Sequence, residues 1–125
     1  MTEEDKKKLS ADADGLLTYE YIANHIGTPD LDIEWLVNNM KRVDPYGQFT
    51  ASAARYLHAI DPNLFASQIS TLISVTIDKD REHKYLSALM NSIYGDDCEQ
   101  RAAELSLSDN NFRRIYKRLH PISAL

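Results

Sequence analysis

The sequence is short of the residues that cross-link a chain or anchor it in a membrane. Its 125 residues include a single cysteine, Cys98, so neither a disulfide framework nor a zinc site of four thiolates can form within one chain. No apolar run approaches the roughly 18 residues that indicate a membrane-spanning helix. The opening stretch, MTEEDKKKLSADADG, lacks the apolar segment of a signal peptide. We therefore expect one soluble domain over residues 1–125, located in the cytoplasm and without membrane contact.

Glycine and proline are also scarce, and their positions are informative. All four glycines and all four prolines fall between segments in which apolar residues recur with helical spacing. Five such apolar stripes lie within residues 19–26, 33–40, 49–60, 65–76 and 86–93. With two more helices at the C-terminal end, this pattern predicts an all-α fold, a compact bundle of six or seven short helices joined by short turns.

Two segments are ambiguous in this pattern. Residues 1–14 carry no apolar stripe, and we expect them to be disordered or frayed. Residues 73–77 alternate with a period of two, as a strand does. We favour helix there, because the helical period extends over more residues, but the strand alternative stays open. We expect no wider internal repeat.

Basic residues are scarce over most of the chain. Residues 1–100 hold nine Lys and Arg against 17 Asp and Glu, a balance of −8. Residues 101–125 hold five basic residues against two acidic ones, a balance of +3. Because an acidic surface repels phosphate, any contact with nucleic acid is expected at the C-terminal end.

The C-terminal stretch RAAELSLSDNNFRRIYKRLHP has the spacing of two helices that cross at a tight turn. Its key positions are Ala102 at the crossing, Leu105 before the turn, Leu107 after the turn, and Phe112 and Ile115 in the second helix. Over residues 98–118 this spacing resembles bacterial helix-turn-helix DNA-binding proteins. We therefore expect a helix-turn-helix-like unit over residues 98–120.

One feature of this unit departs from the common pattern. Ser106 stands at the turn position that often holds glycine. Pro121 ends the second helix and only four residues follow it, so we expect no wing after the helix pair.

The resemblance implies that the second helix is a recognition helix. Asn and Arg side chains can form paired hydrogen bonds with base edges, and Lys and Arg neutralise phosphate. Ser108 or Asp109 is expected to cap the helix. The resemblance implies a transcription regulator that binds double-stranded DNA as a homodimer, since one reading helix gives little specificity. The predicted DNA-binding residues are Ser108, Asn110, Asn111, Arg113, Arg114, Lys117 and Arg118.

A simpler interpretation of the same stretch is a terminal amphipathic helix with a solvated basic face. The spacing alone does not indicate DNA binding, because residues 19–39 fit the same template. That copy carries Asp30, Asp32 and Glu34 where a DNA-binding helix needs positive charge, so we interpret it as structural.

The alternative function is a protein-interaction or adaptor domain without nucleic-acid binding. The chain has more large aromatic residues than one small core obviously needs, and such residues anchor protein interfaces when exposed. The stretch DPYGQF is expected to present Tyr46 at the tip of a turn. The aromatic residues concerned are Tyr19, Tyr21, Trp35, Tyr46, Phe49, Tyr56, Tyr85 and Tyr94.

The sequence offers little support for an enzyme. The group Asp78, Asp80, Glu82 and His83 has metal-ligating residue types, but its spacing divides the ligands between two sides of a helix. A helix start capped by Asp explains the group more simply. Cys98 follows two aspartates, which raise a thiol pKa. We expect no catalytic residues, no metal and no cofactor.

Overall fold

The computed structural model describes residues 1–121 and confirms the all-α fold. In this range the chain contains eight helices, one more than the upper number expected, because α1 lies within residues 1–14. Residues 73–77 belong to α5, so they are helix and not strand. Among the described residues there is no strand, and the helices are α1 (Glu3–Ser10), α2 (Leu16–His25), α3 (Ile33–Val43), α4 (Gln48–Ile60), α5 (Ala66–Lys79), α6 (Leu86–Tyr94), α7 (Ala102–Ser108) and α8 (Asn110–Leu119).

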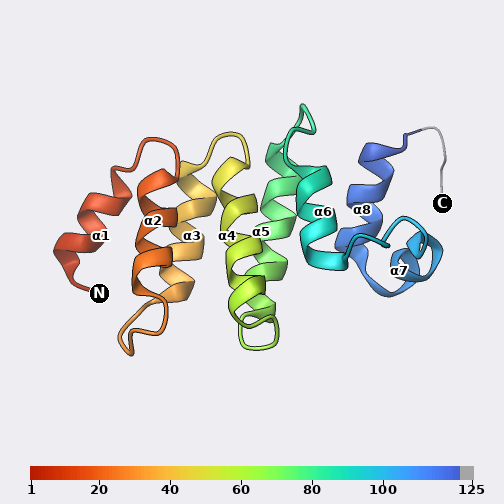
Figure 1. Ribbon diagram of the computed structural model, residues 1–125. Helices are drawn as coiled ribbons and strands as arrows, with labels where there is room; N and C mark the ends of the chain where they lie inside the picture. The colour runs from red at the N-terminus through yellow and green to blue at the C-terminus, as the bar shows by residue number, and fades with distance from the viewer. Residues whose placement is uncertain (122–125) are drawn as a thin grey trace.

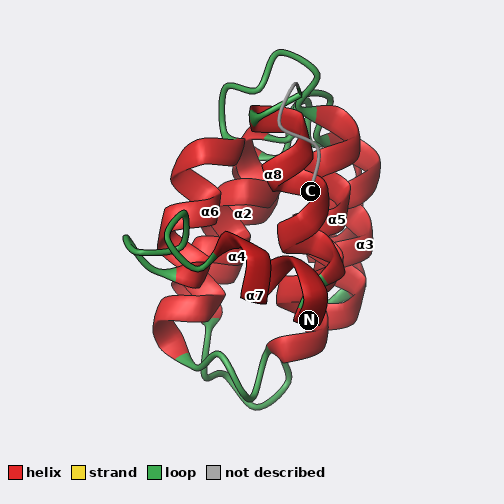
Figure 2. Ribbon diagram, turned by 90° about the vertical axis from the view of Figure 1, so that its right-hand side faces the viewer, coloured by secondary structure: helices red, strands yellow, loops and turns green. Residues whose placement is uncertain are grey.

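Six of these helices stand side by side in two layers (Figure 1). Helices α2, α4 and α6 form one layer, and α3, α5 and α8 form the other, as the view along the row shows (Figure 2). Each helix packs against its neighbours in the same layer and against its partner across the layers. Helix α1 covers one end beside α3, and α7 packs against α8 at the other end. The helices therefore form a two-layer array of successive hairpins.

The core lies between the two layers and follows the predicted apolar stripes. Fully buried residues come from both layers, for example Ile22, Leu57 and Leu89 in one and Leu36 and Leu72 in the other. An exception among the stripe residues is Ile60, which is exposed at the end of α4. The helical period therefore predicted the buried faces well, because an amphipathic helix must turn its apolar side inward.

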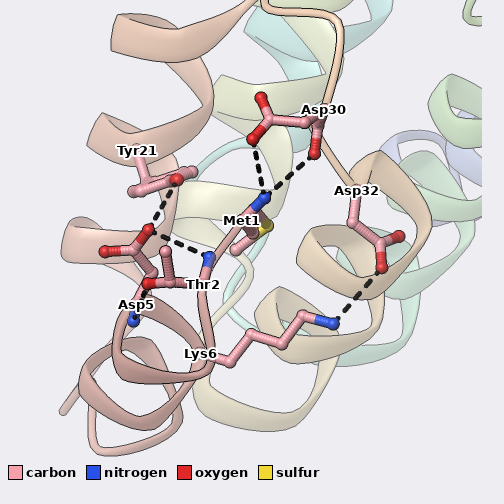
Figure 3. A network of polar contacts seen from close by, with 7 residues as sticks. All are labelled: Met1, Thr2, Asp5, Lys6, Tyr21, Asp30 and Asp32. Carbon is pink, nitrogen blue, oxygen red and sulfur yellow. Dashed lines mark hydrogen bonds and ion pairs between the residues drawn. The ribbon is translucent and has the colours of Figure 1, made fainter.

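Helix α1 replaces the disorder or fraying expected for residues 1–14. Thr2 and Asp5 form a reciprocal capping box, with Thr2 Oγ1 accepting from the Asp5 amide at 3.1 Å. Figure 3 shows how the helix is held. The Met1 ammonium group pairs with Asp30 at 3.2 Å, and Tyr21 Oη donates to Asp5 at 3.2 Å. Leu9 is the buried residue of α1. Caps and polar contacts therefore stabilise a helix that has almost no apolar stripe.

The turns that precede α2, α4 and α6 share one design, which the sequence analysis did not predict. Each turn starts with a buried aspartate, and its carboxylate accepts hydrogen bonds from amides of the turn and of the next helix. In the middle turn, Asp44 accepts from the amides of Tyr46, Gly47, Phe49 and Thr50 at 2.9–3.0 Å. Such bonds satisfy amides that have no partner within the helix. The three motifs are DADGLLT (residues 12–18), DPYGQFT (residues 44–50) and DREHKYL (residues 80–86).

These turns lie on the same edge of the array, and successive turns are in contact (Figure 1). Gly15 and Gly47 occupy the same place in their motifs, and both have a positive φ, +104° and +83°. A Cβ on Gly15 would lie 3.3 Å from Cβ of Asp44, and one on Gly47 would lie 3.5 Å from Cβ of Asp80. Each of these glycines is therefore covered by the aspartate of the next turn. This makes the chain a helical-repeat array with a repeated turn.

Candidate interaction surface

Helix α8, the predicted recognition helix, is fixed by an aromatic cluster. Phe112 and Ile115 are fully buried, as the sequence predicted. The Tyr94 and Phe112 rings meet edge to face with centroids 5.1 Å apart. Asp109 caps the helix by accepting from the Phe112 amide at 3.0 Å, and it also accepts from Tyr94 Oη at 3.1 Å. Burial, with the negative charge of Asp109 nearby, raises the pKa of Tyr94.

The connection between α7 and α8 differs from the predicted turn. Ser106 and Leu107 were expected in and just after the turn, but both belong to α7. Leu107 is 92% exposed, so it does not anchor the second helix. Asp109 alone separates the helices, because its extended backbone ends α7 and its side chain caps α8. Ala102 is buried near the start of α7, as the sequence analysis predicted.

Three of the predicted DNA-binding residues contact α5. Arg114 forms an ion pair with Asp78 at 2.8 Å and donates to Ser74 Oγ at 3.1 Å. Asn111 donates to the Ser70 carbonyl at 3.2 Å. Arg118 donates to the backbone carbonyl of Ile77. These side chains attach α8 to α5.

The other predicted DNA-binding residues are exposed. Arg113 donates to Asn110 Oδ1 at 2.5 Å, a bond within α8. Ser108 Oγ donates to the Glu104 carbonyl at 3.2 Å, a bond within α7. Lys117 is exposed one turn beyond Arg113. The predicted set is therefore divided between one side of α8 that contacts α5 and another that faces away.

Three hollows on this side of the molecule meet at Asp78. One, of about 330 Å³, follows the layer of α3, α5 and α8 and includes Lys41, Ser74 and Arg114. A second, of about 620 Å³, lies between the turn before α4 and the turn before α6 and includes Tyr46. The third, of about 550 Å³, is lined by Asp78, Arg81, His83 and Arg118. We call the combined region the Asp78 surface.

The Asp78 surface is positively charged on a molecule whose net charge is −5. Its carboxylates are Asp78, Asp80 and Glu82. Each of these carboxylates is engaged: Asp78 by Arg114, Glu82 by Lys84 at 2.9 Å, and Asp80 by three backbone amides. The cations are more numerous: Lys41, Lys79, Arg81, Lys84, Arg114 and Arg118. Arg114 and Lys84 balance the charges of Asp78 and Glu82, and the six cations exceed the three carboxylates by three charges.

Two further side chains define this surface. Tyr46 is 70% exposed at the turn before α4, as predicted from DPYGQF. Lys79 Nζ donates to the carbonyls of Lys41 and Asp44, and burial lowers the pKa of Lys79 although Asp44 acts in the opposite direction. Lys79 therefore holds the end of α3, whereas the Tyr46 side chain is largely exposed to solvent.

The sequence analysis considered Asp78, Asp80, Glu82 and His83 as metal ligands and favoured a helix start capped by Asp, and Asp80 does cap the start of α6. Their carboxylates are used in ion pairs and turn bonds, and within residues 1–121 no group of three or more His, Cys, Asp or Glu could hold a metal ion. The sequence also contains a signal for the role of Asp80: the aspartate recurs at the start of the three turn motifs, which indicates that it caps the next helix. Cys98 is buried, and its burial, with Glu99 nearby, raises the pKa of the thiol.

Comparison with protein-family models, curated proteins and solved structures finds no match to this chain. Within the part of the chain that the structure describes, no helix combines the length and the apolar character needed to span a membrane.

Proposed function

We propose that this chain is a helical-repeat binding domain whose Asp78 surface binds an acidic segment of a partner protein. The observation that carries the proposal is the charge of this surface: three hollows that share Asp78 and are lined by six cationic side chains against three carboxylates, a balance of +3, on a protein of net charge −5. Stacked helix hairpins commonly present such extended surfaces to partners. Complementary charge speeds association and gives specificity.

The same contacts favour a peptide over duplex DNA. Arg114 and Arg118 are bonded to α5, so they lie beside the hollows and do not project from α8 as base-reading side chains do. The exposed Tyr46 at the edge of the largest of these hollows is a suitable anchor for a peptide side chain.

A selection from random short peptides, followed by affinity measurement over a salt series, tests this proposal. We expect acidic peptides to be enriched and their affinity to fall with salt. Tyr46→Ala is expected to weaken binding about tenfold, because tyrosine is frequent among the few interface residues that contribute most of the binding energy. Leu64→Ala is the matched control, since Leu64 is equally exposed, 70%, but lies between α4 and α5 at the opposite edge (Figure 1).

Two results would contradict the proposal. One is enrichment of peptides without acidic residues. The other is an affinity that Tyr46→Ala and Leu64→Ala change equally.

A second candidate function is DNA binding through the outer side of α8, in a dimer. The observation in its favour is that Asn110, Arg113 and Lys117 share one exposed face of α8, three and four residues apart. Lys117→Ala should then weaken binding to all duplexes and lower the salt slope by about 1. Arg113→Ala should cost about 1–3 kcal/mol and relax the preference at one base pair. If no duplex is retained at low salt, this candidate is excluded.

A further inference from the structure

The turn before α6 differs from the two equivalent turns at one position. Gly15 and Gly47 hold this position in the earlier turns, and both are buried beneath the next turn. His83 holds it in the turn before α6, with φ +57°. It is exposed, and within residues 1–121 no other non-glycine residue has a positive φ. The array therefore carries a strained histidine where two equivalent turns carry glycine.

The His83 side chain forms no hydrogen bond within its own turn, where only the backbone N–H of His83 donates, to the Asp80 carbonyl at 3.1 Å. The Asp80 carboxylate accepts from the amides of Lys84, Tyr85 and Leu86, so the start of α6 is capped without a side chain at position 83. In the other two turns the glycine at this position donates to the aspartate carboxylate instead. Glycine adopts the left-handed region without a steric penalty, whereas other residues are strained there. Strained residues are concentrated at binding and catalytic sites, where the side chain has a use that offsets the strain. His83 thus points to a function for its imidazole.

The surroundings of His83 are cationic. It lines the hollow of about 550 Å³ together with Arg81, Arg118 and Asp78. Asp78 is paired with Arg114 at 2.8 Å, so its charge is already balanced. Arg118 uses one terminal nitrogen for the Ile77 carbonyl, which fixes the guanidinium group and leaves further N–H donors. Two guanidinium groups and an imidazole therefore face one hollow without an unpaired carboxylate.

We propose that Arg81, His83 and Arg118 bind a phosphate group on the acidic partner segment. This inference rests on the proposed function, because it names the group that the Asp78 surface recognises. Guanidinium groups form paired, charge-assisted hydrogen bonds with phosphate oxygens. A phosphomonoester carries nearly two negative charges and three acceptor oxygens at neutral pH. That matches two arginines and a histidine better than a carboxylate, which has one charge and two oxygens.

The test compares three acidic peptides that differ at one central residue: phosphoserine, serine or glutamate. With the natural sequence of this protein, we expect the phosphoserine peptide to bind about tenfold more tightly than the other two. Arg81→Gln should remove that preference. The affinity for the serine peptide should fall much less than the affinity for the phosphoserine peptide, because Arg81 also contributes one of the six positive charges of the Asp78 surface. Arg81 is exposed, so the variant is expected to fold. Arg101→Gln is the control, since Arg101 is equally a surface arginine but pairs with Asp97 and Glu104 near α7.

His83→Gly separates a binding role from a structural one. Glycine relieves the backbone strain, so the melting temperature should rise, while the preference for the phosphoserine peptide should fall. A rise in melting temperature with an unchanged preference would overturn the role of His83. A destabilised variant would show that the histidine is structural and would also overturn it.

Inorganic phosphate, followed through the backbone amide NMR signals of residues 81–83, distinguishes the two proposals. If the three peptides bind equally well and phosphate shifts none of these signals, the phosphate site is wrong and the acidic-segment proposal stands. If phosphate shifts these signals and Arg81→Gln abolishes the shift, but no peptide binds, the phosphate site stands and the partner proposal is wrong.

Discussion

Buried carboxylates organise the turns of this molecule residue by residue. Asp44 is only 1% exposed, yet four backbone amides donate to it. Asp12 shows the balance of effects: burial acts to raise its pKa, but hydrogen bonds from Thr18, Gly15 and Asp14 outweigh burial, and the pKa is lowered. These hydrogen bonds therefore favour the ionised form of Asp12. Its bonds fix the backbone path that brings the next turn's aspartate onto the glycine.

Gly47→Ala is expected to destabilise the protein more than Gly27→Ala does. Both glycines have a positive φ, +83° and +89°, so alanine is strained at either position by about 1–2 kcal/mol. At Gly47 the new Cβ would also lie 3.3 Å from the Thr76 carbonyl oxygen, whereas at Gly27 nothing lies within 4 Å. Urea denaturation of the two variants measures the difference. Equal losses would mean that the turns are not tightly stacked.

At the scale of single elements, α7 and α8 are held in the array by different contacts. Helix α7 has only seven residues, too short to be stable alone, and Ala102 is its buried residue. It is held by its packing against α8. Helix α8 is held by Phe112 and Ile115 and by the three polar side chains that contact α5. The two helices therefore form one end of the array, and the pair is attached to the other helices mainly through α8.

Leu107→Ser is expected to change the free energy of unfolding by less than about 0.5 kcal/mol, because the side chain is 92% exposed. Phe112→Ala is the contrasting variant. It removes a fully buried aromatic ring and should cost about 3–5 kcal/mol. Denaturant titration of both variants is the measurement. A loss at Leu107 similar to that at Phe112 would indicate that Leu107 anchors α8, as the helix-turn-helix spacing predicted.

The elements that the sequence predicted are those with an apolar stripe. Helix α1 was missed because Leu9 is its one buried residue and its stability comes from caps. The end of α7 was misplaced because a capping Asp109 permits a one-residue connection that apolar spacing does not reveal. The repeat was missed because His83 and Leu86 replace the glycine and threonine of the other turns.

For the candidate site, the sequence identified the basic residues of α8 but not what they contact. Phe112 and Ile115 fix which side of α8 faces the core, and this was predicted correctly. The neighbour at the flank of α8 depends on tertiary packing, since Ser70, Ser74 and Asp78 come from a helix about 40 residues earlier. Local patterns do not encode such a contact.

For the whole molecule, the array implies that stability is not uniform. In stacked repeats each unit contacts only its neighbours, so local opening starts at the ends. Helices α4 and α5 pack against each other most extensively and have neighbours on both sides. We expect their amides to exchange with solvent most slowly, and those of α1 and α7 fastest. Hydrogen exchange followed by mass spectrometry measures this order. One common rate for all helices would instead indicate a single cooperative unit.

The stacking of the turns also gives the array a direction. The glycine of the first turn is covered by Asp44 and that of the second by Asp80, always by a residue later in the chain. A ribosome that adds about 5–20 residues per second needs roughly 2–6 s to make the 32 residues from Asp12 to Asp44. During synthesis the glycine of each of these two turns therefore stays uncovered until the next aspartate has been made, and the contacts between turns form in order from the N-terminus.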